Sequence, residues 1–106
     1  MFISGWTADY PDPDSFLSLF TSSSGSNLVQ FHNKTFDLLV QQAGVARTTV
    51  ERVRLYRAAQ ELLLMEEPAI VPLYLHRMAF LTSNRVKKIP VTRMSDLYIK
   101  YVELMP

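Results

Sequence analysis

The sequence predicts an α/β fold in which about three helices pack with a few short strands. Apolar residues recur at helical spacing in three stretches between residues 13 and 66. Runs rich in β-branched and aromatic residues follow Pro68 and lack that spacing. With 106 residues the chain can bury one modest core, so we expect one compact unit.

The composition excludes several classes of protein. Hydrophobic residues make up 48% of the chain and charged residues 20%, as in an ordinary globular domain. The net charge is +1 and the basic residues are scattered, so the sequence has no nucleic-acid-binding footprint. Without cysteine, the chain can form no disulfide, thiolate metal site or cysteine nucleophile. The longest apolar runs span only a few residues, far short of a membrane helix.

The first part of the chain predicts a short strand, a proline-rich turn and a short helix. Residues 1–6 are expected to form the strand. Asp12 followed by Pro13 is typical of an N-cap with proline at the first helical position. The polar loop at residues 21–27 should end the helix. The apolar residues at helical spacing between these points are Phe16, Leu17 and Phe20.

Asn33 predicts the N-terminus of a second helix, because asparagine is a favoured N-cap residue. Gly44 is well placed to end this helix. The apolar residues expected on its buried face are Phe36, Leu39, Val40 and Ala43.

Thr48 and Glu51 have the spacing of a capping box and predict the start of a third helix. This helix is expected to reach about Glu66, since Pro68 disfavours helical geometry in the residue before it. The apolar stripe expected along it consists of Val50, Val53, Tyr56, Ala59 and Leu63.

Three further strands are expected after Pro68. Residues 69–75 are apolar and β-branched, and Pro72 within them indicates a strand edge or a bulge. Residues 78–82 are expected to form the partner strand, and residues 83–90 a polar connector. Residues 97–104 alternate loosely and predict a terminal strand, preceded by a non-helical segment at residues 92–96.

Three aspartates crowd the proline-rich turn, at positions 9, 12 and 14. A calcium loop of the EF-hand type requires glycine at its sixth position and glutamate at its twelfth, where this sequence has Asp14 and Phe20. Paired catalytic carboxylates need a defined separation across a cleft, which sequence cannot show. For Asp12 and Asp14 we favour helix capping and solubility.

No residue pattern indicates an enzyme. His32 and His76 are far apart and form no zinc-binding motif. The chain has no G-x-S-x-G nucleophile elbow, and its serine run lies in a polar loop with no evident base. We therefore expect no catalytic residue, no metal and no cofactor. His76 remains a candidate ligand contact, with ordinary packing or a surface position as the alternative.

Five segments of the chain form an ordered set of motifs: Gly5-Trp6-Thr7-Ala8-Asp9-Tyr10-Pro11-Asp12-Pro13, Phe16-Leu17, Phe36-Asp37-Leu38-Leu39 with Ala43, Arg54-Leu55-Tyr56 with Ala59, and Ile70-Val71-Pro72-Leu73-Tyr74. This ordered set resembles the C-terminal part of bacterial oligopeptide- and dipeptide-binding proteins of ABC importers, the family 5 extracellular solute-binding proteins. The match runs nearly end to end, and its order and spacing are more specific than any one motif.

The resemblance implies a two-lobed, periplasmic-binding-protein-like (type II) fold, in which α/β lobes close around an extended peptide. Full-length proteins of this family are several times longer than 106 residues. Residues 1–82 would then be part of the C-terminal lobe, and residues 83–106 the crossover segment and terminal strand that return toward the other lobe. The chain would supply half of a binding site.

The resemblance also implies ligand contacts. Asp9 matches the family aspartate that meets the α-amino group of a peptide, and Trp6 and Tyr10 would supply apolar walls. Tyr74 and His76 are further candidates for ligand binding. A charge-assisted contact in a closed cleft is strong, and backbone hydrogen bonds can hold the rest of a peptide without selecting its side chains. Core packing of Trp6 and simple turn capping by Asp9 are the alternatives.

The expected partners are a peptide ligand, ABC permease subunits and the remaining N-terminal part of the binding protein, with no nucleic acid. The expected location is periplasmic or otherwise extracytoplasmic, with a signal or lipid anchor in a region outside this chain. Members of the same fold family also bind nickel complexes, haem or sugars, and these ligands remain alternatives. A stand-alone protein-interaction domain, docking through its apolar helix faces, is an alternative of a different class.

Overall fold

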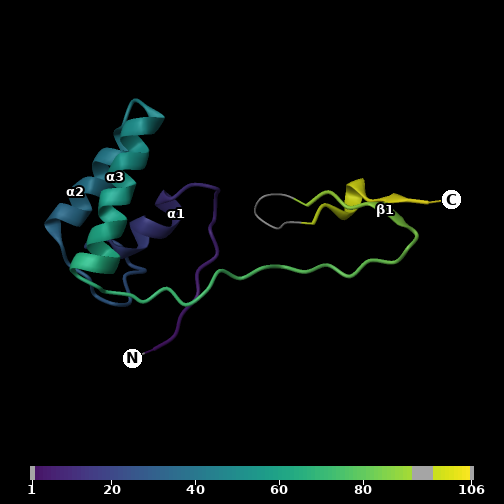
Figure 1. Cartoon of the computed structure of the whole chain (residues 1–106), viewed down its shortest axis with the longest axis horizontal. Coiled ribbons are helices and arrows are strands. Elements are labelled where there is room, and N and C mark those ends of the chain that lie inside the picture. The colour runs from purple at the N-terminus through teal and green to yellow at the C-terminus, as the bar shows by residue number, and fades with distance from the viewer. Residues whose placement is uncertain (1, 92–96, 106) are drawn as a thin grey trace. The chain divides into compact units, whose positions relative to one another are not determined.

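The computed structural model of the chain describes residues 2–91 and 97–105, and it divides into two compact units, Met1–Pro72 and Leu73–Pro106 (Figure 1). The first unit is helical and contains every buried residue of the described chain. The second holds a two-stranded sheet and buries none of its described residues. The expectation of one compact unit is therefore wrong, because the described residues after Pro72 bury no side chain in an apolar layer of their own.

The first unit begins with residues 2–7 in no regular secondary structure, so the strand predicted at residues 1–6 is not formed. Met1 lies outside the described residues. A strand needs a neighbour to receive its backbone hydrogen bonds, and no described segment pairs with this one. The short helix α1 (Asp14–Leu17) follows and tightens into the 3₁₀ turn η1 (Ser18–Phe20).

The helix α2 (Lys34–Val45) starts where the sequence predicts. The Asn33 side chain accepts a 2.9 Å hydrogen bond from the Phe36 amide, which satisfies one free N–H of the first turn. The expectation that Gly44 ends α2 is wrong by one residue. The helix passes through Gly44 and ends at Val45, and Ala46 takes an extended conformation in place of a left-handed glycine cap.

The helix α3 (Thr49–Glu61) is capped by Thr48, whose hydroxyl accepts a 3.2 Å hydrogen bond from the Glu51 amide. It continues into the π-helical turn η2 (Leu62–Glu66), so the helical run ends near Glu66 as predicted. The wider turn presents two successive leucines, 62 and 63, to the core.

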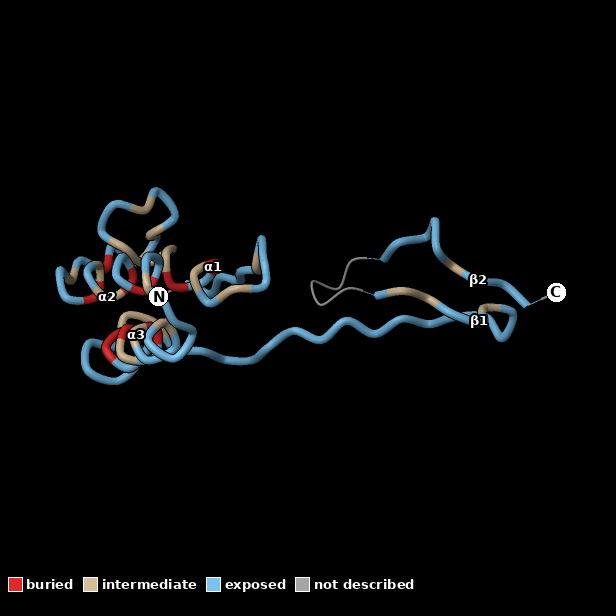
Figure 2. Tube along the Cα trace, turned by 90° about the horizontal axis from the view of Figure 1, so that it is seen from above, coloured by how far each residue is buried: buried red, intermediate tan, exposed pale blue. Residues whose placement is uncertain are grey.

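Helices α1, α2 and α3 enclose the core of the first unit, which appears in red on their facing sides (Figure 2). Phe31 and Phe36 meet edge to face, with ring centroids 5.3 Å apart. The predicted faces of α2 and of the second half of α3 are confirmed. The prediction for the start of α3 is wrong, since Val50 is 81% exposed and Val53 half exposed. The buried residues are Ser15, Leu17, Phe31, Phe36, Val40, Ala43, Tyr56, Ala59, Leu62 and Leu63.

The two strands predicted at residues 69–75 and 78–82 are absent, and these residues form no ladder in the described chain (Figure 1). The residue pair between them, His76-Arg77, is not a favoured hairpin turn, and Pro72 has no N–H to donate. The apolar side chains of residues 71–81 therefore lie exposed.

The second unit contains an irregular antiparallel pair of strands, β1 (Val86–Lys88) and β2 (Glu103–Leu104). Between them lie a bridge from Val91 to Leu97 and the 3₁₀ turn η3 (Ile99–Tyr101). The terminal strand predicted at residues 97–104 is thus only partly formed, because η3 interrupts it. The predicted non-helical segment at residues 92–96 lies outside the described residues.

The result is a small helix-rich structure with a two-stranded sheet. In the described part of the chain, no helix has the length and apolar character needed to cross a membrane.

Candidate ligand-binding turn

The acidic turn, residues 9–14, leads into α1 and is held by its own hydrogen bonds. The Asp12 amide donates to the Tyr10 carbonyl (2.8 Å), and the Asp14 amide donates to the Asp12 carboxylate (2.9 Å). The Ser15 amide donates to the Asp12 carbonyl (3.1 Å). The helix α1 begins at Asp14, so its N-cap position falls on Pro13, which makes no side-chain hydrogen bond, and the prediction of Asp12 as the N-cap is wrong by one residue. The Asp12 carboxylate instead closes a short turn just before the helix.

The buried Ser15 ties the start of the turn to its end. Its hydroxyl oxygen accepts a 2.9 Å hydrogen bond from the Asp9 amide. The backbone at Asp9 is thus fixed to the first turn of α1.

Arg52, on α3, holds the acidic turn against the helices. Its Nη2 atom lies 2.8 and 2.9 Å from the two carboxylate oxygens of Asp12. Its Nη1 atom donates to the carbonyl of Ala43 near the end of α2 (3.2 Å). The guanidinium carbon lies 5.1 Å from the centroid of the Tyr56 ring. A single side chain thus contacts the turn, α2 and α3.

Two tyrosine hydroxyls bind the carboxylate of Asp14. Tyr10 donates to it at 2.7 Å and Tyr56 at 3.2 Å. The hydrogen bond to Asp14 raises the pKa of Tyr10, and burial followed by the negative charge of Asp14 raises the pKa of Tyr56 to about 12. Both phenols therefore stay neutral donors over the ordinary pH range.

The same contacts shift the ionisation of the ion pair. The hydrogen bond from the Asp14 amide, and after it the contact with Arg52, lowers the pKa of Asp12 below its usual value. The hydrogen bond to Asp12 in turn raises the pKa of Arg52. Asp12 stays a carboxylate and Arg52 a cation through the physiological range.

Asp9 differs from the other two acids of the turn. Its side chain is exposed, and its carboxylate neither accepts a hydrogen bond nor joins an ion pair with the described residues of the chain. Trp6 is 46% exposed and Tyr10 44%, and both lie within four residues of Asp9 in sequence. Trp6 is not part of the core of its unit.

The remaining predicted contacts belong to the second unit. Tyr74 is 81% exposed, and His76 is exposed two residues later. The described side chains of neither unit gather three or more His, Asp or Glu residues in a metal-binding group.

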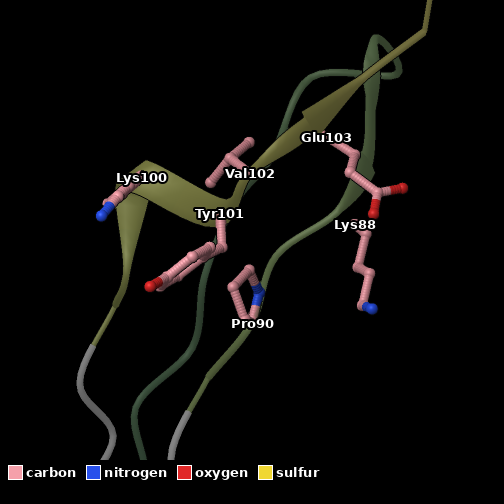
Figure 3. Close-up of a pocket in the computed structure, with 6 residues that line it drawn as sticks. All are labelled: Lys88, Pro90, Lys100, Tyr101, Val102 and Glu103. Atoms are coloured by element: carbon pink, nitrogen blue, oxygen red, sulfur yellow. The ribbon is translucent and has the colours of Figure 1, made fainter.

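A shallow depression lies on the second unit, between the strand pair and η3 (Figure 3). None of the predicted ligand contacts lines it. Glu103 and Lys88 lie at one end of it, and Lys100 lies near the ring of Tyr101 at the other (Figure 3). The depression is open, and its lining comes from exposed or half-exposed residues.

Sequence reasoning missed Arg52 and the full role of Tyr56. The sequence places Tyr56 in the apolar stripe and in the family motif but predicts no role for its hydroxyl, and it predicts no role for Arg52. Their helical spacing of four residues places them on one face of α3, which is a weak signal. The acid that Arg52 binds lies 40 residues away, and no local pattern indicates such a pair.

The chain is similar to curated bacterial binding proteins, although no family model matches it. It is 33% identical over 92 residues to the periplasmic murein peptide-binding protein MppA of Escherichia coli, a match that covers 87% of this chain and 17% of the relative. It is 36% identical over 86 residues to the dipeptide-binding protein DppE of Bacillus subtilis, covering 81% of this chain and 16% of the relative. It is 39% identical over 71 residues to heme-binding protein A of Haemophilus influenzae, covering 64% of this chain and 13% of the relative.

The chain thus spans about one sixth of the length of the first two relatives. The matches cover most of this chain, and several of the relatives are named for the peptides they bind. The chain belongs to the oligopeptide- and dipeptide-binding family of bacterial extracellular solute-binding proteins, and it corresponds to a C-terminal part of them.

Proposed function

We propose that the chain is one part of a longer solute-binding protein that captures peptides for an ABC importer, and that Asp9 receives the α-amino group of the peptide. The observation that carries this proposal is the state of the three turn acids. Asp12 and Asp14 are occupied by protein donors, whereas the Asp9 carboxylate is exposed and has no partner in the described chain.

The chemistry of a peptide N-terminus supports this role for Asp9. The α-amino group is cationic at neutral pH, and an ammonium enclosed without a partner is costly. A carboxylate at hydrogen-bond distance provides a charge-assisted contact, roughly twice as strong as a neutral hydrogen bond. The alternative that Asp9 only caps its turn has little support, since its backbone amide makes the turn contact and its carboxylate does not.

Trp6 and Tyr10 are proposed as the apolar walls beside the amine site. Both rings are nearly half exposed, Tyr10 is the next residue after Asp9, and its hydroxyl is fixed on Asp14. Tyr74 and His76, in the second unit, are proposed as further contacts that adjust ligand preference.

For the parent protein, the longer solute-binding protein that contains this chain, we propose a two-lobed fold. Residues 1–82 would belong to its C-terminal lobe, and residues 83–106 would return toward the other lobe. A clamp of this kind would act outside the cytoplasmic membrane and pass its peptide to the permease. The function requires no catalytic step.

The test uses the full-length protein that contains this chain, with Asp9→Asn compared with Glu61→Gln. Glu61 is an exposed acid on α3, so its variant also loses one negative charge. The ligands are a pool of tripeptides with free amino groups and the same pool after N-acetylation. We expect Asp9→Asn to weaken the free-amine peptides by about tenfold or more, the effect of losing a charged hydrogen bond. The acetylated pool should bind wild type and variant equally.

Two outcomes would contradict this proposal. One is an equal loss for the free and the acetylated peptides on Asp9→Asn, which would leave Asp9 without a special role for the amine. The other is the absence of peptide binding to the wild-type protein.

A second candidate ligand is haem, because heme-binding protein A of Haemophilus influenzae is 39% identical over 71 residues. Haem carries carboxylates and no α-amino group, so an unpaired carboxylate at Asp9 would repel it. Absorbance titration of the same full-length protein with haem distinguishes the haem candidate from the peptide candidate. Haem binding that tripeptides fail to displace would favour this candidate over peptide.

A further inference from the structure

We infer that Arg52 is a positioning residue of the proposed ligand site, which fixes the acidic turn and leaves Asp9 as its single available carboxylate. The inference rests on the proposed function of Asp9. It assigns a role to a residue that does not itself belong to the proposed ligand contacts.

The geometry gives Arg52 three anchors. One guanidinium nitrogen is bound to the carbonyl of Ala43, and the guanidinium lies against the Tyr56 ring. The other terminal nitrogen is thereby held where it reaches both oxygens of Asp12. The position of the turn is thus set by α2 and α3, the helices that form the core.

Lysine could not replace this arrangement. The planar guanidinium presents several N–H donors in a fixed fork, whereas an ammonium is a single point charge on a flexible stem. A lysine at position 52 could bind Asp12 or the Ala43 carbonyl, but it would not hold both in one geometry.

Arg52 also offsets the negative charge of the acidic turn. The turn places three carboxylates within six residues, at positions 9, 12 and 14. Arg52 compensates Asp12, and the hydroxyls of Tyr10 and Tyr56 bind Asp14. Without Arg52, the Asp12 carboxylate would keep the hydrogen bond from the Asp14 amide but lose its cationic partner, three residues from Asp9, and a cationic ligand would have two competing sites. Arg52 therefore gives the amine one defined position.

The ion pair is suited to positioning more than to holding the fold together. The side chains of Arg52 and Asp12 are each 31% exposed, and ion pairs near the surface contribute little to stability. Substitution of Arg52 is therefore expected to leave the helices folded, which circular dichroism checks.

The experiment compares Arg52→Gln, Arg52→Lys and Arg54→Gln in the full-length protein. Arg54 is exposed on the same helix and makes no ion pair with the described residues, so it is the matched control. The affinities of the free-amine tripeptide pool and of its acetylated form are measured for each variant. We expect Arg52→Gln to weaken only the free-amine pool, by about tenfold, because the charged hydrogen bond is misplaced. Arg52→Lys should rescue it in part, and Arg54→Gln should match wild type.

The ratio of the affinity for free-amine peptides to the affinity for acetylated peptides distinguishes positioning of the acidic turn from a general effect on the fold. A purely structural role for Arg52 would weaken free and acetylated peptides alike, and that result would overturn the inference. Asp12→Asn is the second variant, because it breaks the same ion pair without leaving a competing carboxylate. It should change the ratio in the same direction, since the turn loses its charged anchor on Arg52.

Asp9→Asn, measured in parallel, distinguishes the two proposals. If Asp9→Asn changes the ratio and Arg52→Gln does not, the inference about Arg52 fails while the function of Asp9 stands. If Asp9→Asn leaves the ratio unchanged, the proposed function fails, and the inference falls with it.

Discussion

Tyr56 connects the core of the helical unit to the acidic turn. Its ring is buried between the helices, and its hydroxyl donates to Asp14 at 3.2 Å. Burial and the neighbouring carboxylate raise the pKa of the phenol to about 12, while the nearby Arg52 acts in the opposite direction. The fold therefore favours the protonated phenol.

This preference predicts a loss of stability in alkali. The pKa of Tyr56 is about 12 in the folded chain and about 10 in the unfolded chain, so the unfolded state loses its proton first. The stabilisation is complete below pH of about 10 and is lost as the pH rises from about 10 to about 12. Urea unfolding at a series of pH values measures the free energy of unfolding across this range.

The variant Tyr56→Phe tests whether the Tyr56 phenol causes the alkaline loss of stability. It should lower the free energy of unfolding by about 1 kcal/mol at neutral pH, through loss of one hydrogen bond, and should reduce the alkaline loss. The matched control is Tyr74→Phe, since Tyr74 is exposed in the second unit and its phenol makes no hydrogen bond with the described residues. An alkaline loss as steep in Tyr56→Phe as in wild type would show that another group is responsible.

The acidic turn shows how far local sequence can lead to a site. The neighbouring residues Asp12 and Pro13 predict the start of α1 to within one residue, because the signal lies within one turn of chain, although the N-cap position falls on Pro13 and not on Asp12. The contact of Asp12 with Arg52 was not predictable, because it forms only when α1 packs against α3. The role of Asp9 came from the resemblance of the whole motif, and it stays a prediction.

Among the secondary-structure elements, α2 is the one that the sequence specified best. Its start is fixed by the Asn33 side chain, and its buried residues recur at helical spacing on one face. Both signals are local and agree with each other, which makes such a helix predictable.

Replacement of Asn33 by alanine should therefore weaken the helical unit. We expect the free energy of unfolding to fall by about 1 kcal/mol, because the Phe36 amide loses its acceptor. Thr35→Ala, an exposed change in the first turn of the same helix, should leave stability unchanged or slightly higher. Urea unfolding followed by circular dichroism measures both variants. Equal stability of Asn33→Ala and wild type would mean that water replaces the cap without cost.

The errors in α3 have a different origin. Val50 and Val53 fit the apolar stripe by spacing, but they lie exposed while the second half of the helix is buried. A helical pattern identifies a face, whereas burial requires a partner opposite each turn of that face. In the first half of α3, the contact with the acidic turn is made by the polar side chain of Arg52, which binds Asp12.

The predicted strands failed for a related reason at the level of the whole molecule. Residues 69–82 have strand-forming side chains, yet their backbone groups find no ladder partner in the described chain. A helix completes its hydrogen bonds within one segment, whereas a strand depends on a neighbour that can be far away in sequence. The relatives are about five times as long as this chain, and we propose that the corresponding remaining part of the parent protein supplies the missing neighbour.

The exposure of this segment predicts where a protease will cut the isolated chain. Arg77 lies in the exposed stretch of residues 71–82, outside all helices and strands. Arg52, Arg54 and Arg57 lie within α3, where the backbone is hydrogen-bonded. A protease must bind its substrate as an extended chain, so accessible segments without secondary structure are cleaved first.

Trypsin should accordingly cut after Arg77 well before it cuts within α3, and mass spectrometry of a time course should show an early fragment of residues 1–77. In the variant Arg77→Gln that fragment should be absent, while the other early products remain. In urea the helical arginines should become as sensitive as Arg77, because their protection depends on the fold. Early cleavage at Arg52, Arg54 or Arg57 without urea would contradict the helical unit itself, since it would require α3 to open as readily as the exposed segment.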